Sequence, residues 1–223
     1  ALTIDAQSTT TGQGGVTFDG VVGGTKLAAV DITGHAVTIN QAFSSSSTVE
    51  ITNAGLLTVA DDATITAAGG FLQNGAGAFS LGADIGTTNA DITIGSALTL
   101  LKDGNAAAQS IQLSSGSGGG AISLASITGA DNSLDLISGS GTTTVSGAVS
   151  GVNALGLQAA GASGAVSFQD DLSATSLSTA AGGYNLSLLG SSTSITNAVS
   201  FTNTGALNLG DGDGDGLVFS GGI

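Results

Sequence analysis

The sequence predicts an all-β protein whose chain coils into a single-stranded parallel β-helix, also called a β-solenoid. First, two apolar residues flanking one small or polar residue recur throughout the chain, a pattern typical of strands that bury one face. Second, these pairs begin about every eleven residues between residues 111 and 219, and such a constant step indicates an internal repeat. Third, the chain has 38 glycines, no proline and no long segment with a 3.6-residue period, so we expect essentially no helix.

Short strands are predicted along the whole chain. The less regular pairs are Leu2/Ile4, Val16/Phe18, Val30/Ile32, Val37/Ile39, Val49/Ile51, Leu57/Val59, Phe79/Leu81, Ile92/Ile94 and Leu98/Leu100. The regular pairs are Ile111/Leu113, Ile122/Leu124, Leu134/Leu136, Leu155/Leu157, Val166/Phe168, Leu186/Leu188, Val199/Phe201, Leu207/Leu209 and Leu217/Phe219, with the single residues Val145 and Leu177 in two of the gaps. Each pair predicts one strand with its two apolar side chains in the interior.

The segments between the pairs are rich in Gly, Asn and Asp, which are the residues that turns prefer. Examples are TNAG (52–55), AAGG (67–70), ITGADN (127–132) and TNTG (202–205). No linker or change of composition divides the chain, so we expect one continuous domain over residues 1–223. The repeat pattern continues from Leu2 to Ile223 without a recognisable capping segment. We therefore expect that the chain is a segment or repeat unit of a longer array.

Three strands per coil is the arrangement that we favour. Three eleven-residue arms use about 30–33 residues, so the chain would make about seven coils and a stack of roughly 30–35 Å. Two strands per coil would instead give about ten coils and a flatter rod. An antiparallel sandwich also has short strands every 8–12 residues, but it rarely keeps the same pair-and-turn chemistry for so long.

The charge and composition exclude several classes of function. Sixteen acidic residues stand against two basic ones, Lys26 and Lys102, and the net charge is −14. Nucleic acids and anionic membrane surfaces both need Lys or Arg, so neither is expected as a partner. The chain has no cysteine and no run of 18 or more apolar residues, which excludes disulfides, thiol chemistry and insertion into a membrane by a helix.

Several segments resemble the repeats of large secreted bacterial surface proteins. These segments are GGVTFDGVVGGTKLAAVDITG (14–34), GAVSGVNALGLQAAG (147–161) and SITNAVSFTNTGALNLGDG (194–212). They look like filamentous-haemagglutinin-like and autotransporter-passenger β-helix repeats. This resemblance implies a right-handed β-helix, export, and an adhesive or scaffold role at the cell surface, with no catalytic residues to carry over.

The sharpest local motif is GDGDGDG (210–216). Asp211, Asp213 and Asp215, followed by Gly216, match the first half of a D-x-D-x-D-G calcium loop. The second half does not match, because Gly222 stands where a bidentate Glu is needed. We therefore consider a weak Ca²⁺ site, with a dissociation constant of about 10⁻⁴–10⁻³ M, and as the alternative a solvated acidic turn. No cofactor is required.

Catalysis is not expected. The adjacent acids Asp61–Asp62 and Asp170–Asp171 would need a further acid in a groove to act on a polysaccharide, and their positions suit exposed turns. Acidic sugars also need a cation, and the chain has no Arg. His35 is the only histidine and fits a surface turn.

Threonine runs at residues 9–11 and 142–144 raise an ice-binding alternative, since flat Thr arrays occur on solenoids. Such arrays should recur once per coil on one face, and these two runs do not. We therefore rank ice binding below the structural and adhesive functions.

The functional prediction rests on the two ends of the coil. An uncapped solenoid exposes unpaired strand edges and its apolar interior. We expect a structural extracellular or cell-surface protein that contributes to a filament, sheath or fibre by end-to-end stacking, with itself as partner. A surface adhesin that binds a carbohydrate is the alternative.

Overall fold

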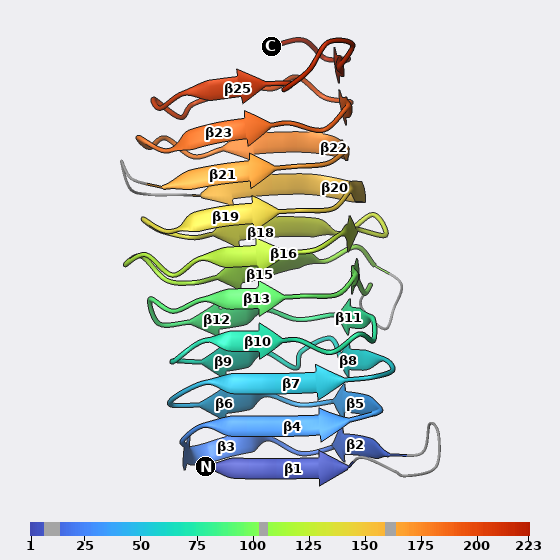
Figure 1. The fold of residues 1–223 in the computed structure, drawn as a ribbon, viewed down its shortest axis with the longest axis vertical. Coiled ribbons are helices and arrows are strands. Elements are labelled where there is room, and N and C mark those ends of the chain that lie inside the picture. The colour runs from blue at the N-terminus through green and yellow to red at the C-terminus, as the bar shows by residue number, and fades with distance from the viewer. Residues whose placement is uncertain (7–13, 103–106, 159–163) are drawn as a thin grey trace.

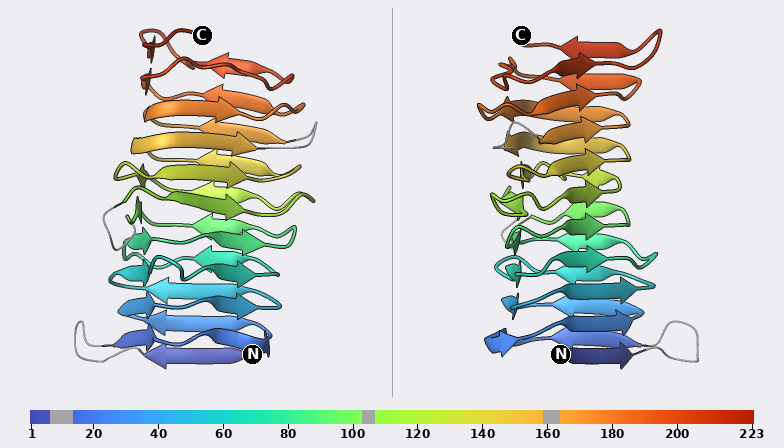
Figure 2. Two further views of the ribbon diagram at one scale, coloured as in Figure 1. Left: turned by 180° about the vertical axis from the view of Figure 1, so that it is seen from behind. Right: turned by 60° about the vertical axis from the view of Figure 1, so that its left-hand side comes forward.

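Parallel strands stacked in columns make up the whole fold, as the sequence predicts. The structure, a computed structural model, describes residues 1–6, 14–102, 107–158 and 164–223. Its described residues form 26 strands and no helix. The chain climbs from one end of the stack to the other, so that strands about one turn apart lie side by side (Figures 1 and 2).

The first column, here called the first wall, is a ten-stranded sheet. Its strands are β1 Leu2–Ala6, β4 Val30–Gly34, β7 Val49–Asn53, β10 Phe71–Gln73, β13 Ile92–Ile94, β16 Ile122–Leu124, β19 Thr142–Val145, β21 Ala165–Phe168, β23 Asn185–Leu188 and β25 Leu207–Leu209. Neighbours pair in parallel, for example Phe71 with Val49 on one side and with Ile92 on the other.

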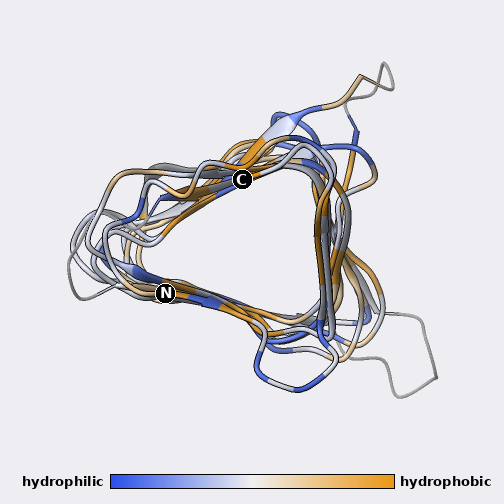
Figure 3. Cartoon of the chain, turned by 90° about the horizontal axis from the view of Figure 1, so that it is seen from above, coloured by the Kyte–Doolittle hydropathy of each residue, from blue (hydrophilic) through white to orange (hydrophobic). Residues whose placement is uncertain are grey.

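The second and third columns, the second and third walls, belong to one sixteen-stranded sheet. The second wall contains β2 Gly15–Phe18, β5 Ala36–Ile39, β8 Leu57–Val59, β11 Phe79–Leu81, β14 Leu98–Leu100, β17 Ile127–Thr128, β24 Ser192–Ile195 and β26 Gly216–Phe219. The third wall contains β3 Val22–Leu27, β6 Phe43–Ser45, β9 Ile65–Ala67, β12 Ile85–Thr87, β15 Ser110–Ser114 and β18 Ser133–Ile137. The long strands β20 Val149–Gln158 and β22 Leu172–Thr179 bend around the corner and join the two walls. Seen along the axis, the outline is triangular (Figure 3).

The stack has about nine turns, so the prediction of about seven is wrong. Successive partners on the first wall are about 21 residues apart, as from Val49 to Phe71 and on to Ile92. The eleven-residue step is half of one turn: Ile111 and Leu134 lie on the third wall, and Ile122 lies between them on the first. Between residues 111 and 195 the second-wall strands have no i, i+2 pair of large apolar residues, as in β17, whose two residues supply only Ile127 to the interior. At about 4.8 Å per turn, the stack is roughly 43 Å long.

Alternation along each strand builds the core. In β7 the side chains of Val49, Ile51 and Asn53 are buried, while those of Glu50 and Thr52 point outward. Apolar side chains from the three walls fill the interior, and the largest fully buried ones are Tyr184, Phe43, Phe71, Phe79 and Phe168. The predicted inward pairs of the interior turns are therefore confirmed, because a narrow coil has room for only one face of each strand. The prediction of a strand at Val199/Phe201 is wrong, since no strand lies between β24 and β25.

Buried polar side chains form hydrogen bonds with backbone groups at the corners of the coil. Asn53 donates from Nδ2 to the carbonyl oxygens of Gly55 (2.6 Å) and Gly77 (3.1 Å), and its Oδ1 accepts from Gln73 Nε2 (2.7 Å). Gln73 Oε1 in turn accepts from the Ser96 hydroxyl (3.1 Å), so the amides bridge consecutive turns. These bonds supply partners to carbonyl groups that the sheets leave unpaired at each bend.

Candidate functional site

The N-terminal end of the stack presents strand edges and apolar side chains. β1, β2 and β3 each have a neighbour on one side only. Their inward residues Leu2, Ile4 and Phe18 are only partly buried, whereas Val30 and Ile32 in the next turn are 1% and 0% exposed. The Phe18 ring packs edge-on against Phe43, with ring centroids 5.3 Å apart. This end is therefore an apolar surface bordered by unpaired backbone groups.

The C-terminal end has the same character. β25 and β26 are each paired on one side, and the isolated bridge Gly182–Asn203 joins the segments that precede β23 and β25. Leu207 is 38% exposed, and Leu209 and Phe219 are only partly buried. Phe201 and Phe219 meet in a T-shaped contact at 6.0 Å. Both described ends thus leave inward-facing side chains incompletely covered.

Unpaired polar atoms gather in the last turns. Within the described residues, four buried side-chain atoms lack a hydrogen bond, and three of them are Tyr184 Oη, Thr193 Oγ1 and Asn203 Oδ1. Burial raises the pKa of Tyr184, and the Thr179 side chain opposes this effect. The Thr179 hydroxyl makes no hydrogen bond of ordinary geometry to Tyr184, since it is engaged with Ser200 O and Thr202. Among the described residues, more buried polar side-chain atoms therefore lack a hydrogen bond at this end than in the middle of the stack.

The GDGDGDG turn lies between β25 and β26, at the C-terminal end. Asp215 Oδ2 accepts hydrogen bonds from the backbone N–H groups of Asp211 (2.7 Å) and Gly212 (3.0 Å). Asp211 and Asp213 are exposed. No three His, Asp or Glu side chains among the described residues are grouped closely enough to hold a metal ion. In this conformation the turn is closed by its own backbone, and calcium binding stays a prediction.

Replacement of Asp215 by Asn is expected to destabilise this turn by about 0.5–1 kcal/mol, because two charge-assisted hydrogen bonds at an exposed site weaken. Asp211→Asn is the matched control and should leave the melting temperature unchanged. Thermal unfolding followed by circular dichroism, with and without millimolar Ca²⁺, measures both. A calcium-dependent rise in the melting temperature that Asp211→Asn and Asp213→Asn abolish would show the calcium site; equal melting temperatures for both variants would contradict the closed turn.

The two acid pairs lie in turns, as their sequence context suggests. Asp62 has a positive φ of 65°. Asp171 Oδ1 accepts from Ser191 Oγ (3.0 Å) and Ser192 N (2.8 Å), and Asp170 Oδ1 accepts from Asp171 N (2.8 Å). These contacts stabilise the corner between the first and second walls.

A further acid does lie beside one of the pairs. Asp62, but not Asp61, lines a hollow of about 150 Å³ together with Asp84, Gln109 and Ser110. Asp84 Oδ1 accepts a hydrogen bond from the backbone N–H of Gln112 (2.8 Å). The hollow is small and polar, and its acids come from neighbouring turns, a relation that the sequence pairs did not reveal.

The lone histidine and the described lysine occupy surface turns. His35 is exposed between β4 and β5. Lys102 Nζ lies 3.2 Å from Asp131 Oδ2, an exposed ion pair that contributes little to stability. The side chain of Lys26 lies outside the described residues.

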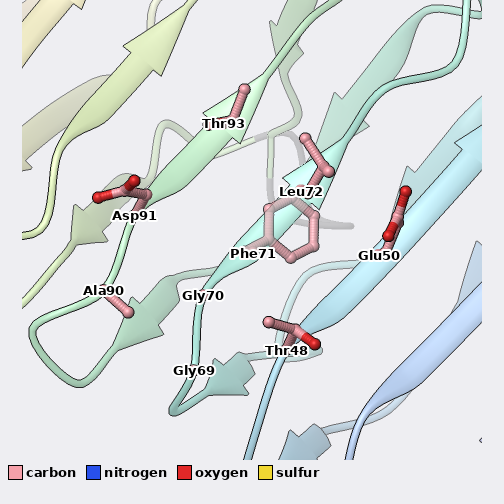
Figure 4. Close-up of a pocket in the computed structure, with 9 residues that line it drawn as sticks. All are labelled: Thr48, Glu50, Gly69, Gly70, Phe71, Leu72, Ala90, Asp91 and Thr93. Atoms are coloured by element: carbon pink, nitrogen blue, oxygen red, sulfur yellow. The ribbon is translucent and has the colours of Figure 1, made fainter.

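A larger hollow opens on the first wall (Figure 4). Its volume is about 420 Å³, and its lining includes Glu50, Leu72, Thr93 and Asp91. Glu50, Leu72 and Thr93 are in register on three consecutive turns. Gly70, with φ 118°, contributes no side chain to the outer surface and leaves the space open. This hollow could not be predicted from the sequence, because its residues come from three turns.

A row of hydroxyl side chains runs along the second wall. In most of these strands an outward residue follows an inward one, and the pairing brings these residues into register from turn to turn. A bulge interrupts the register between Ser150 and Ser173, and Val218 takes the position in β26. The row, here called the hydroxyl ladder, is Thr17, Thr38, Thr58, Ser80, Thr99, Thr128, Ser150, Ser173 and Ser194. This row was not predicted from the sequence, and neither of the two Thr runs considered for ice binding contributes to it. The Thr run at 142–144 lies on the first wall, and the run at 9–11 lies outside the described residues.

The fold and these surfaces define the class of protein: the chain is a β-solenoid, consistent with a β-helix repeat protein. Comparison with known protein families, with curated protein sequences and with solved structures finds no match in any of the three. None of the described residues belongs to a helix that is long and apolar enough to cross a membrane.

Proposed function

We propose that this chain is a structural component of an extracellular filament, sheath or surface fibre, in which β-solenoid units continue one another end to end. The observation that supports the proposal is the pair of open ends, each with strands paired on one side only and with partly exposed inward side chains. Fully burying one Leu or Phe side chain contributes about 1.5–3 kcal/mol. Several such side chains at each end can offset the entropic cost of association, about 4–15 kcal/mol.

The strand columns suggest how two copies would join. β25 ends the first wall and β26 ends the second, while β1 and β2 begin the same two walls. A second copy placed with β1 over β25 and β2 over β26 would continue both sheets in parallel. Leu209 and Phe219 would then be covered by the second copy's Ile4 and Phe18. Such a contact joins two different surfaces and does not close on itself, so it propagates into a filament.

We further propose a right-handed, three-sided coil at the cell surface, as the resemblance to secreted bacterial β-helix repeats implies. Support comes from Figure 1, where the near strands run from left to right as the chain climbs from the N-terminus, and from the triangular outline in Figure 3. The net charge of −14 keeps such a fibre soluble and limits lateral association.

Blocking one end tests the proposal. Ile4→Asp places a charge in the N-terminal contact and Phe219→Asp places one in the C-terminal contact. Their matched controls are Thr3→Asp and Val218→Asp, which put the same charge on the outer face of the same strands. We expect wild-type protein and both controls to form longer species as concentration rises, in light scattering and electron microscopy, and the two blocked variants to stay monomeric.

Mixing the two blocked variants gives a sharper result. Each keeps one intact end, so an equimolar mixture should form a dimer and nothing longer. Compact monomers of the wild type at high concentration would contradict assembly from separate copies. A native mass well above the calculated 21.0 kDa for one covalent chain would place the continuation within a longer polypeptide.

A second candidate function, binding to ice, is favoured by the hydroxyl ladder. None of its hydroxyls makes a side-chain hydrogen bond within the described part of the chain. The neighbouring outward positions Ala36, Ala78 and Ala97 are small and uncharged, whereas Leu56 in the same column is 47% exposed. Hydroxyl and methyl groups repeated about every 4.8 Å form a regular surface for ordered water.

Ice-recrystallisation and thermal-hysteresis measurements test this candidate. Thr99→Lys, in the middle of the ladder, should abolish any activity, while Thr93→Lys on the first wall should retain it. Absence of activity in the wild type would exclude ice binding.

A further inference from the structure

The hollow on the first wall has an apolar floor between two carboxylates. Leu72 lies at the centre of β10, with Glu50 on the turn below it and Asp91 at the start of the strand above (Figure 4). Glu50 is in register with Thr93, two residues beyond Asp91, so the two backbone positions are about 9–10 Å apart across the sheet and about 6–7 Å apart along it. This separation is too large for one metal ion to contact both, since Ca²⁺–oxygen distances are about 2.3–2.6 Å.

Each of the two carboxylates is held by one oxygen and leaves the other available. Glu50 Oε1 accepts from Asn74 Nδ2, and Asp91 Oδ1 accepts from the backbone N–H of Ala121, both at 2.8 Å. Glu50 Oε2 and Asp91 Oδ2 have no hydrogen bond to any described residue. Ionised carboxylates only accept hydrogen bonds, so a ligand that lies here must bring donors.

The charge around the hollow favours a cation. Asp31 is in register with Glu50 on the neighbouring strand, and adds a third negative charge. The described lysine side chain, Lys102, pairs with Asp131. An anionic ligand would be repelled, whereas an ammonium group would make charge-assisted hydrogen bonds to the free carboxylate oxygens.

A second hollow continues the first along the axis. Its volume is about 220 Å³, it shares Thr93 with the first, and it adds the hydroxyl groups of Ser123, Thr144 and Ser146. Thr93, Ser123 and Thr144 are in register, and their hydroxyls make no hydrogen bond within the described residues. The two hollows together form the first-wall groove, acidic at one end and lined with hydroxyls at the other.

We propose that the first-wall groove binds an amino-sugar glycan with free amine groups, lying along the axis of the coil. Glu50 and Asp91 accept hydrogen bonds from its ammonium groups, the apolar face of a sugar ring lies on Leu72, and the hydroxyls from Thr93 onward bond to sugar hydroxyls. A basic peptide would satisfy the carboxylates but would leave the hydroxyl-lined half unmatched. The groove is independent of end-to-end assembly, since all its residues lie away from both ends.

Calorimetric titration of the full chain with a β-1,4-linked glucosamine oligosaccharide tests the proposal. We expect Glu50→Gln and Asp91→Asn each to weaken binding about five- to tenfold, because each removes one charged acceptor. The N-acetylated oligosaccharide should bind more weakly than the free amine, and polygalacturonate should not bind. Circular dichroism should show that both variants keep the wild-type fold, with a melting temperature only slightly lower for Asp91→Asn, whose bond from the Ala121 N–H weakens.

Asp135→Asn is the matched control, because it removes the same charge from an outward position of β18 on the third wall. If it weakens binding as much as Asp91→Asn, the association is general electrostatic attraction and the proposal is overturned. Absence of binding to the glucosamine oligosaccharide overturns it as well. Equally tight binding of an oligolysine peptide that responds to the same two variants would assign the groove to basic peptides instead.

Discussion

Replacement of Gly77 by alanine is expected to lower the free energy of unfolding by about 3–5 kcal/mol, the range of severe overpacking at a buried site. An alanine Cβ at this position would overlap the carbonyl oxygen of Gly55 in the turn below, and would also lie 2.8 Å from Asn53 Nδ2. The Gly55 carbonyl oxygen belongs to the backbone, so it can move away from the new Cβ only if the two stacked turns separate. Urea or thermal unfolding followed by circular dichroism measures the change, and the melting temperature should fall by about 10 °C.

Gly86→Ala is the matched control for that variant. An alanine Cβ at Gly86, on the outer face of β12, would meet no atom within 4 Å. Its stability should equal or slightly exceed that of the wild type, because alanine loses less backbone entropy than glycine on folding. Equal destabilisation by the two variants would contradict the close stacking of the turns at Gly55 and Gly77.

Replacement of Asn53 by alanine is expected to cost about 2–4 kcal/mol, because a buried hydrogen-bonding hub is removed. The Asn53 side chain is fully buried and bonds to the carbonyls of Gly55, Gly77 and Ala78 and to the Gln73 amide. The variant would leave the Gln73 amide without its bond to Asn53 and the Ala78 carbonyl with one acceptor site unfilled in a dry interior. Denaturant unfolding at constant pH checks the prediction.

Asn40→Ala serves as the comparison for Asn53. Asn40 donates one hydrogen bond, from Nδ2 to Asp19 Oδ1 (2.7 Å), at the exposed surface. Its loss should change stability by less than about 1 kcal/mol, since water replaces the partner. A similar cost for both asparagines would show that the buried amides do not link the turns as the structure indicates.

The inward residues were predictable because strands alternate with a fixed period of two. Val49 and Ile51, for instance, are predicted as an inward pair and are fully buried. The length of a turn was misread, because the eleven-residue step joins the first and third walls and the second-wall strands between residues 111 and 195 have no i, i+2 pair of large apolar residues. The prediction of about seven coils failed at this point, although the fold class itself is confirmed.

The candidate surfaces were only partly predictable. Asp211, Asp213 and Asp215 stand together in the sequence and were recognised as a motif at once. Glu50 and Asp91 are far apart in the sequence and share one hollow only because two successive turns, of 22 and 21 residues, bring their strands close together. The hydroxyl ladder was likewise readable only after each strand had been assigned to a wall.

The sequence by itself determined that the chain forms stacked strands with one buried face, that its turns depend on Gly, Asn and Asp, and that anionic partners are disfavoured. These properties follow from local alternation, composition and charge, which need no knowledge of distant contacts. Only the tertiary structure decided the length of a turn, and hence which outward residues are neighbours. In a solenoid each surface is made of residues about one turn apart, so a small error in the length of the turn places every outward side chain beside the wrong partner.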